Sequence, residues 1–289
     1  MPIFSEMTHK YLRAKKKFPN VWCSGCGIGT VMGAIIRAID HLHLSRDEVV
    51  MISGIGCSSR MPVYVDFNTL HTTHGRPLAF ATGVKLAKPN LKVIIVTGDG
   101  DALAIGGNHF IHACRRNIDL TTILINNSTY GMTGGQVAPT TPFMKIGTTA
   151  PYGNRERGFD ISKLAMAAGA PFVARGTVYH VVQLQKLVEQ AILKKGFSLV
   201  EVISQCHTLY GRLNKEGGPV EMMKWQRDHA IPISAAGKVP AEKLKDKFFT
   251  GVLWDIDFPE YCEEYDKVIA LAQSLAEGEG VRVKGKERE

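Results

Sequence analysis

The sequence places two carboxylates inside a glycine-rich turn, at a position where a phosphate group would usually bind. The stretch VIIVTGDGDALAIGG (residues 93–107) ends its apolar run in alternating glycine and aspartate: Gly98, Asp99, Gly100 and Asp101. A dinucleotide-binding turn would carry a third glycine where Leu103 stands, and a nucleotide phosphate loop would carry Lys followed by Ser or Thr. The turn therefore matches neither of the common phosphate-binding patterns.

A divalent cation would reconcile the carboxylate with a phosphate, because a metal ion can bridge the two. Mg²⁺ prefers oxygen ligands and is usually held by one or two protein side chains together with substrate phosphates. Asp99 would supply a charged oxygen, while the backbone amides of Gly100 to Ala102, at the start of the next helix, would face the phosphate. A second ligand is expected at the end of the following strand, where TTILINNSTYG places Asn126 and Asn127. The intervening chain is long enough for a turn, a helix and a return strand.

Six cysteines in a chain without an export signal indicate metal or redox chemistry instead of a disulfide framework. WCSGCG places Cys23 and Cys26 at the two-residue spacing of many zinc, iron–sulfur and dithiol sites. Cys57, in GIGCSSR, and Cys206, in VISQC, each follow a predicted strand, so a parallel sheet could gather all four thiols at one edge. Four such thiolates suit either an iron–sulfur cubane or zinc. The other two cysteines lie in no comparable motif and are interpreted as packing residues: Cys114 and Cys262.

The elements that must position these groups can be read from the apolar pattern. Short β-branched runs predict buried strands at residues 49–53, 93–97, 121–125, 172–174 and 199–203. Apolar residues at helical spacing predict amphipathic helices over residues 31–42 and 181–192. This alternation predicts an α/β fold in which helices sandwich a parallel sheet. Ligands bind at the carboxyl ends of such strands, which is where SGIGCSSR, GDGDA, NNSTYGMTGGQ and SQCH fall.

Length and composition suit one large domain: the chain has 289 residues, of which 45% are hydrophobic. We expect a single domain over residues 1–289 with a C-terminal extension from about residue 214, read as short helices and connections, and a mobile tail from about residue 277. The apolar runs are too short to span a bilayer, and the N-terminal segment lacks the apolar stretch of a secretory signal. A cytoplasmic protein without membrane contact is therefore expected.

The formal net charge of +8 points to anionic partners. Basic residues are scattered and form no stripe interleaved with aromatic side chains, so nucleic acid is not an expected partner. Anionic cofactors, a dicarboxylate substrate or an acidic electron-carrier protein would each suit this charge.

The pairing of GDG with NN after one crossover resembles the thiamine diphosphate motif of enzymes that depend on that cofactor. The resemblance implies that Mg²⁺ is bound by Asp99, by the Asn127 side chain and by the Thr129 carbonyl. YGMTGG would continue the cradle for the diphosphate, with Thr133 as a hydrogen-bond donor.

A longer series of motifs resembles the β subunit of 2-oxoacid:ferredoxin oxidoreductases. WCSGCG, GIGCSSR, HTTHGR, TGDGDALAIGGNH and NNSTYGMTGGQ follow one another between about Trp22 and Cys206. In that family the matching cysteines bind one 4Fe–4S cluster, which implies these ligands: Cys23, Cys26, Cys57 and Cys206. The implied cofactor contacts are spread over the strand-end loops: Ile55, Gly56, Cys57, Ser58, His74, Gly98, Asp99, Gly100, Asp101, Ala102, Asn127, Thr129, Gly131, Met132 and Thr133.

The resemblance also implies an activity and its partners. Such an enzyme oxidatively decarboxylates a 2-oxoacid to its acyl-coenzyme A with thiamine diphosphate and passes electrons through the cluster to ferredoxin, or runs the reverse carboxylation. The motifs look closest to the 2-oxoglutarate branch. In thiamine diphosphate enzymes the activating glutamate comes from a different domain type, and no second domain of this kind is found here. A partner α subunit that supplies the pyrimidine-side domain and this glutamate is therefore expected, in an (αβ)₂ heterotetramer.

Two further polar residues are candidate catalytic residues. The resemblance places His74, in HTTHGR, close to thiamine diphosphate, and Arg60 could pair with a substrate carboxylate through two hydrogen bonds. The ordinary alternatives are a structural histidine and a surface ion pair. Three other readings of the whole chain stay open: a non-redox carboligase or decarboxylase with structural zinc, a pyruvate-type oxidoreductase, and a metal-stabilised binding module.

Overall fold

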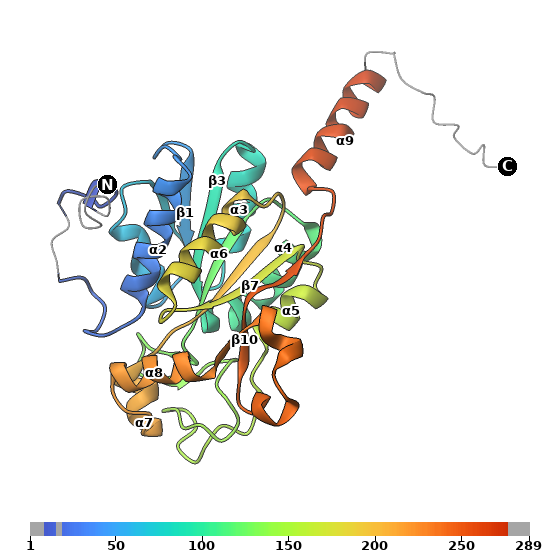
Figure 1. The fold of residues 1–289 in the computed structure, drawn as a ribbon. Coiled ribbons are helices and arrows are strands. Elements are labelled where there is room, and N and C mark those ends of the chain that lie inside the picture. The colour runs from blue at the N-terminus through green and yellow to red at the C-terminus, as the bar shows by residue number, and fades with distance from the viewer. Residues whose placement is uncertain (1–8, 16–18, 277–289) are drawn as a thin grey trace.

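The computed structural model describes residues 9–15 and 19–276, and an eight-stranded sheet with helices on both faces forms its centre (Figure 1). The order of the strands across this sheet is β2-β1-β3-β4-β8-β7-β10-β9. The strands are β1 (Val49–Ser53), β2 (Asn68–His71), β3 (Lys92–Gly98), β4 (Thr121–Asn126), β7 (Phe172–Thr177), β8 (Ser198–Ile203), β9 (Ala230–Pro232) and β10 (Phe248–Asp255). A separate two-stranded hairpin pairs β5 (Thr129–Tyr130) with β6 (Gln136–Val137).

The six strands from β2 to β7 in this order run parallel, which confirms the predicted parallel sheet. All five predicted strands are present. Strand β2 was not predicted, because this short edge strand is exposed or half-buried and mostly polar. Reading the extension as helices and connections was wrong for residues 248–255, where β10 pairs antiparallel with β7. A break in its pairing register between Val252 and Trp254 interrupts the alternation that would reveal a strand.

The sheet is covered by two helical layers (Figure 1). The helices are α2 (Ile28–His41), α3 (Pro77–Ala87), α4 (Gly107–Arg116), α5 (Ile161–Ala167), α6 (Val181–Leu193), α7 (Arg212–Asn214), α8 (Pro219–His229) and α9 (Tyr261–Ala276). Helices α2 and α6 pack on one face and helices α3, α4 and α5 on the other, each with its own hydrophobic core. Within β1, Val49 and Met51 enter the first core while Val50 and Ile52 enter the second, as the two-residue period of a strand requires.

The two predicted amphipathic stripes pack in one core although they are far apart in sequence. Ile35 and Ile39 of α2 join Leu184 and Val188 of α6 in the first core. Helix α4 ends at Asn117, whose left-handed backbone (φ 51°) is a common helix terminus. The Asn117 side chain also accepts the amide of Phe197, at 2.9 Å, before strand β8 begins.

The loops that carry the predicted site residues follow four neighbouring strands. β1, β3, β4 and β8 are adjacent and parallel, so their carboxyl ends lie at one edge of the sheet. This arrangement brings together loops from four distant parts of the sequence.

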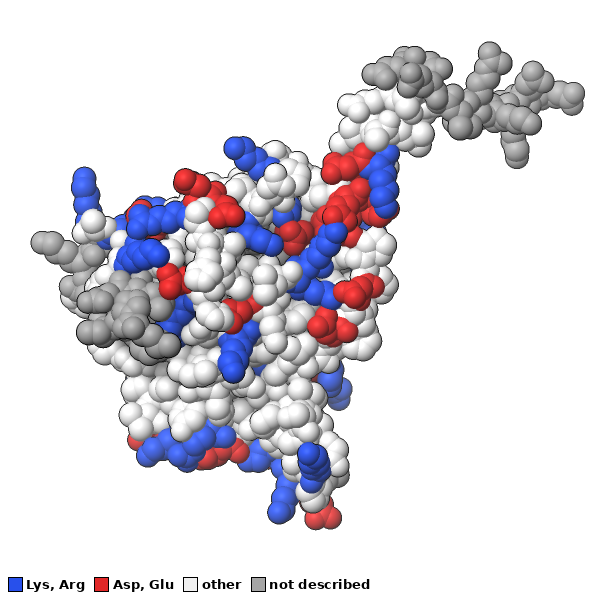
Figure 2. All heavy atoms as spheres, turned by 45° about the horizontal axis from the view of Figure 1, so that its top comes forward, with Lys and Arg blue, Asp and Glu red and all other residues white. Residues whose placement is uncertain are grey.

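Helix α9 projects away from the body of the protein (Figure 1), and the mobile tail predicted from about residue 277 lies outside the described residues. On the face shown in Figure 2, Lys and Arg are scattered among Asp and Glu, and acidic residues gather near the base of this helix. Within the part of the chain that the structure describes, no helix combines the length and the hydropathy needed to cross a bilayer.

Candidate functional site

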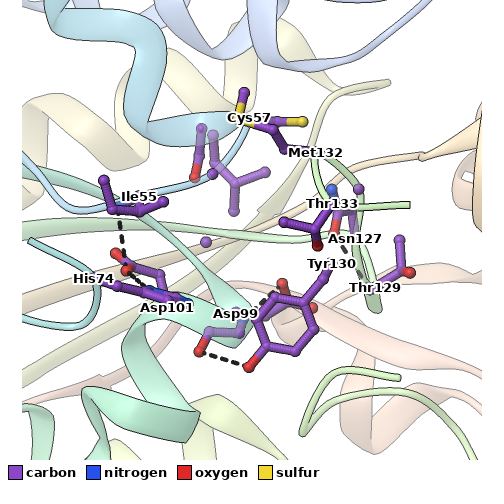
Figure 3. Close-up of a pocket in the computed structure, with 16 residues that line it drawn as sticks. Ile55, Cys57, His74, Asp99, Asp101, Asn127, Thr129, Tyr130, Met132 and Thr133 are labelled. Atoms are coloured by element: carbon purple, nitrogen blue, oxygen red, sulfur yellow. Dashed lines mark hydrogen bonds and ion pairs between the residues drawn. The ribbon is translucent and has the colours of Figure 1, made fainter. Parts of the chain in front are cut away.

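A cavity of about 90 Å³ opens where β1, β3 and β4 end, and we call it the first cavity (Figure 3). Every predicted cofactor contact except Ala102 lines it. Ile125 and Tyr130 complete the lining, and neither was predicted. The structure therefore brings the loops of residues 55–58, 98–101 and 127–133 together around one space.

Asp99 is buried at the end of β3, with 2% of its surface exposed. Its Oδ1 accepts the Gly100 amide at 2.9 Å, and its Oδ2 accepts the Thr140 hydroxyl. Burial raises the pKa of the Asp99 carboxyl to about 6, against the opposing effect of hydrogen bonds from Thr140, Gly100 and Ser128. A carboxylate has about four lone-pair sites, so these three donors leave room for a further partner. A divalent cation is a partner that would offset the burial of this charge.

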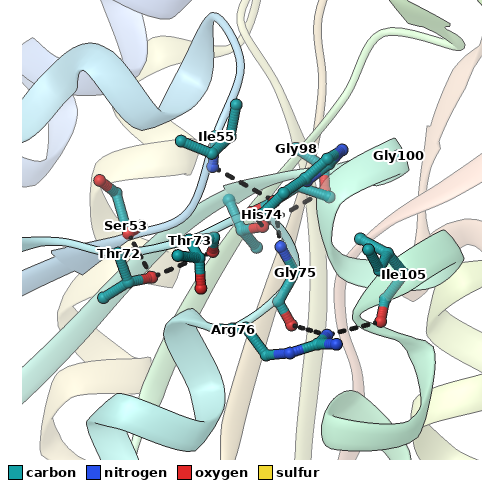
Figure 4. A network of polar contacts seen from close by, with 12 residues as sticks. Ser53, Ile55, Thr72, Thr73, His74, Gly75, Arg76, Gly98, Gly100 and Ile105 are labelled. Atoms are coloured by element: carbon teal, nitrogen blue, oxygen red, sulfur yellow. Dashed lines mark hydrogen bonds and ion pairs between the residues drawn. The ribbon is translucent and has the colours of Figure 1, made fainter.

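Asp101, labelled in Figure 3, holds the loops around the first cavity in place, and Figure 4 shows three of the residues that it contacts: Ile55, His74 and Gly75. Its Oδ1 accepts the amides of Ile55 and Gly75 at 3.2 and 2.7 Å, and its Oδ2 accepts the Thr97 hydroxyl at 2.7 Å. His74 Nδ1 lies 2.5 Å from Oδ1 and must carry the proton, because an ionised carboxylate can only accept. In the neutral ring, Nε2 is then the acceptor nitrogen. Asp101 was predicted to contact the cofactor, and its observed contacts also give it a positioning role.

The β5–β6 hairpin forms the wall beside Asp99 (Figure 3). The Thr129 amide donates to Asn127 Oδ1 at 3.4 Å, and the Thr133 hydroxyl donates to Gln136 Oε1 at 2.6 Å. Tyr130 donates its hydroxyl to the Gly100 carbonyl at 3.2 Å. These contacts keep Asn127 and the hairpin next to the GDG turn.

Glycine is required at position 100 because of this close packing. A Cβ atom built on Gly100 would lie 2.2 Å from the Tyr130 ring. Such a distance is far below van der Waals contact, so any side chain there would displace the ring. Glycine at this position therefore lets the GDG turn pack directly against the Tyr130 ring.

A second cavity of about 60 Å³ lies beside the first and is lined by four thiols: Cys23, Cys26, Cys57 and Cys206. A Cβ atom built on Gly131 would be 3.5 Å from the sulfurs of both Cys57 and Cys206, so this glycine lies against two of them. Burial, with smaller contributions from the neighbouring thiols, raises the pKa of Cys26 to about 11 and that of Cys57 to about 12. Among the described residues, no three His, Cys, Asp or Glu side chains are grouped tightly enough to hold a single metal ion.

Hydrogen bonds fix the cysteine loops around the second cavity. Trp22 donates its indole N–H to the Cys57 carbonyl at 2.7 Å. Gln205, at the end of β8, donates to the Gly25 carbonyl at 2.8 Å and accepts from Gln226 of helix α8 at 3.0 Å. The extension after residue 214 therefore helps to position the N-terminal cysteine loop.

Some predicted site residues do not reach either cavity. Arg60 lies on the short helix of residues 58–63 and lines neither cavity, so its proposed contact with a substrate gains no support from the geometry. The Ala102 side chain is buried in the second core, because the helix that starts at the GDG turn directs it inward. Cys114 and Cys262 are both buried in the same core, as expected of packing residues.

The sequence reasoning missed several residues that shape the site. Tyr130 stands inside the motif NNSTYG, and an aromatic residue beside a predicted ligand is a signal that could have been used. Thr140 contacts Asp99 from a loop whose sequence, APTTP, carries no such signal.

Comparison with known proteins identifies the class to which this fold and site belong. Residues 54–202 match the family model described as "Thiamine pyrophosphate enzyme, C-terminal TPP binding domain"; thiamine pyrophosphate is another name for thiamine diphosphate. The matched range contains the GDG turn, the NN motif and every residue that lines the first cavity. The protein is therefore a thiamine diphosphate-binding enzyme subunit.

The particular family follows from whole-chain relatives. "2-oxoglutarate synthase subunit KorB" of Methanocaldococcus jannaschii is 51% identical over 92% of this chain and 98% of its own length. The protein of the same name from Archaeoglobus fulgidus is 49% identical over 89% of this chain and 92% of its own. The chain belongs to the β-subunit family of the 2-oxoacid:ferredoxin oxidoreductases.

A solved structure has the same fold. The "2-oxoglutarate:ferredoxin oxidoreductase from Magnetococcus marinus with 2-oxoglutarate, coenzyme A and succinyl-CoA bound" superposes with a TM-score of 0.81 at 32% identity, covering 96% of this chain and 93% of that one. The predicted family, fold class and enzyme class are thus confirmed. The non-redox and binding-module alternatives are not supported.

Proposed function

We propose that this chain binds thiamine diphosphate with Mg²⁺ in the first cavity and a 4Fe–4S cluster in the second, and that it oxidises 2-oxoglutarate to succinyl-coenzyme A together with an α subunit. One observation carries the proposal: the two cavities share a wall. Cys57, Asn127, Gly131 and Met132 line both. Two cofactors bound there would be neighbours, so an electron could pass from one to the other without a further carrier.

The proposed Mg²⁺ ligands are Asp99, the Asn127 side chain and the Thr129 carbonyl. Support comes from the chemistry of this oxygen-rich set and from the buried Asp99 carboxylate, whose hydrogen-bond donors among residues 9–15 and 19–276 are neutral. Bound thiamine diphosphate would supply the decarboxylation chemistry. The chain's own groups hold the diphosphate end, and Asp101 keeps the His74 ring in one tautomer at the cavity wall.

The proposed cluster ligands are Cys23, Cys26, Cys57 and Cys206. Support comes from their arrangement around a space, because a cubane occupies a volume between its ligands whereas zinc brings its ligands to one point. Burial raises the pKa of Cys26 and of Cys57, and a metal bound in the second cavity would hold both groups as thiolates. All six cysteines are free thiols, which suits the reducing cytoplasm that we propose as the location.

The proposed substrate and partners follow the names of the relatives. Those names specify 2-oxoglutarate, and the solved relative is a ferredoxin oxidoreductase with coenzyme A bound. We place the pyruvate-type reading second for this reason. The first cavity, at about 90 Å³, is smaller than the roughly 300 Å³ of typical ligand pockets. A partner α subunit would complete it and supply the activating glutamate, and we propose one domain per β chain in an (αβ)₂ assembly.

The test is anaerobic purification of the chain with and without its α subunit. The complex is expected to contain one thiamine diphosphate and four iron and four sulfide per β chain, and to reduce ferredoxin with 2-oxoglutarate and coenzyme A. The isolated chain is expected to show no turnover. Zinc in place of iron, or turnover by the isolated chain, would contradict the proposal, and faster turnover with pyruvate would reassign the substrate.

A further inference from the structure

A hydroxyl group stands between two of the four thiols of the second cavity. Thr208 Oγ1 lies 3.7 Å from Cys23 Sγ and 4.0 Å from Cys206 Sγ, both within hydrogen-bonding range for sulfur. The two cysteines come from distant parts of the sequence, since Cys23 precedes α2 and Cys206 follows β8. Thr208 also lines the cavity itself.

The direction of these hydrogen bonds depends on what the cavity holds. Without a metal, either the thiol or the hydroxyl can donate. A cysteine bound to iron is a thiolate and carries no proton, so the hydroxyl of Thr208 is then the only possible donor of the pair. The hydroxyl proton stays on Thr208 in both redox states, and one electron enters or leaves the cluster without any bond being made or broken.

Thr208 is held in position by its backbone. Arg212 Nε donates to the Thr208 carbonyl at 3.1 Å, and the Gly211 amide donates to the Cys206 carbonyl at 2.9 Å, which closes a turn over residues 206–211 that contains Thr208. Threonine is stiff about its first side-chain torsion because it is branched at Cβ. The turn and the branched side chain therefore restrict the positions that the hydroxyl can occupy.

Among the described residues, no other side chain hydrogen-bonds a sulfur of this cavity, while the backbone amide of Ile28 bonds Cys26. The Trp22 indole N–H is used by the Cys57 carbonyl. His207 lines the cavity, but its Nδ1 has no hydrogen-bond partner among the described residues. Thr208 is thus the side chain whose polar atom contacts two of the sulfurs.

We propose that Thr208 is a positioning residue that raises the reduction potential of the cluster by donating a hydrogen bond to its thiolate ligands. The reduced cluster carries one more negative charge than the oxidised cluster, so a donor to the thiolates stabilises the reduced state more. Hydrogen bonds to the sulfurs are one of the factors that set such potentials. This inference rests on the proposed function, because it requires a cluster in the second cavity.

The test is a redox titration of the anaerobically purified complex, followed by the visible and electron-spin signals of the cluster. Thr208→Val removes the hydroxyl but keeps the volume of the side chain. We expect a lower midpoint potential, with the ratio of reduced to oxidised cluster at a fixed potential falling about threefold to tenfold; tenfold corresponds to 59 mV for a one-electron couple. Thr208→Ser keeps a hydroxyl and is expected to stay near the wild-type potential.

Thr82→Val is the matched control, because its hydroxyl bonds the Leu78 carbonyl within helix α3 and lines neither cavity. Iron and sulfide are counted on every variant, and if Thr208→Val loads poorly, Thr208→Ala gives the same comparison with Thr208→Ser. Equal potentials for wild type and the hydroxyl-free variants, with the cluster present, would overturn this inference alone. A wild-type complex without a cluster would overturn the proposed function and this inference with it.

Discussion

Replacing Asp99 with Asn is expected to make the metal-free protein more stable while removing its ability to bind the cofactor. Asp99 is buried, and burial raises the pKa of its carboxyl from 3.8 to about 6. A carboxyl group with a raised pKa stabilises the folded state only when protonated, so this contribution is complete below about pH 4 and is lost as the pH rises through about 6. At pH 7 the ionised group therefore destabilises the metal-free fold by about 3 kcal/mol, which is roughly two pKa units at 1.36 kcal/mol each.

The amide of Asn fits the contacts that the carboxylate makes. Its oxygen can accept the Gly100 amide, and its NH₂ group can donate to the Thr140 hydroxyl, which also accepts. In metal-free buffer at pH 7, Asp99→Asn is expected to raise the free energy of unfolding by up to about 3 kcal/mol, or the melting temperature by about 5–10 °C. At pH 5 the gain should shrink. Calorimetric titration with Mg²⁺ and thiamine diphosphate is expected to show no binding.

Asp101→Asn is the matched control, since it makes the same chemical change two residues away. Asp101 accepts hydrogen bonds from three nitrogen donors and one hydroxyl, so losing its charge weakens several bonds at once. The free energy of unfolding of this variant is expected to fall by about 1–3 kcal/mol. The reasoning is refuted if Asp99→Asn lowers the melting temperature of the metal-free protein at pH 7, or if it still binds thiamine diphosphate with wild-type affinity.

Three further predictions concern packing and the cysteines. Gly100→Ala places a Cβ atom 2.2 Å from the Tyr130 ring and forces the ring to move. The free energy of unfolding in urea should fall by about 1–3 kcal/mol, and the affinity for thiamine diphosphate should weaken. An unchanged affinity would contradict the close packing. Arg175→Met leaves the buried Glu201 carboxylate without its cationic partner and should lower the free energy of unfolding by about 3–5 kcal/mol. Much of this loss should be recovered when Glu201→Gln is added. Equal stability of the single and double variants would argue against a buried ion pair. Cys114→Ala, in the second core, should leave the iron content of the complex unchanged, and a loss of iron would disprove its packing role.

The buried strands could be predicted from sequence because each is a continuous β-branched run flanked by helical periodicity. Strands β2 and β10 could not be predicted in this way. β2 is an edge strand, held by one neighbour, and its exposed and half-buried residues carry a weaker signal than those of a central strand. β10 lies between β7 and β9, and its irregular pairing with β7 hides the alternation.

The candidate site divides in the same way. The GDG turn and the NN motif could be recognised as a metal and phosphate site from sequence, because binding these groups restricts the residue types next to a strand end. Thr140 and Thr208 are ordinary loop threonines, and only their places in the folded chain bring them to Asp99 and to the thiols. Arg60 shows the converse, since its proximity to Cys57 in sequence does not bring its side chain to a cavity.

By itself the sequence determined the types of the reactive groups, their order along the chain and the strand ends on which they stand, because local residue patterns are enough to specify these. The tertiary structure decided which strand ends are neighbours. By pairing with β4, strand β8 carries Cys206 to the edge where Cys57 and the GDG turn already lie. The order of strands across the sheet depends on how the two helical layers pack their apolar faces, and a local pattern of residues does not specify that packing.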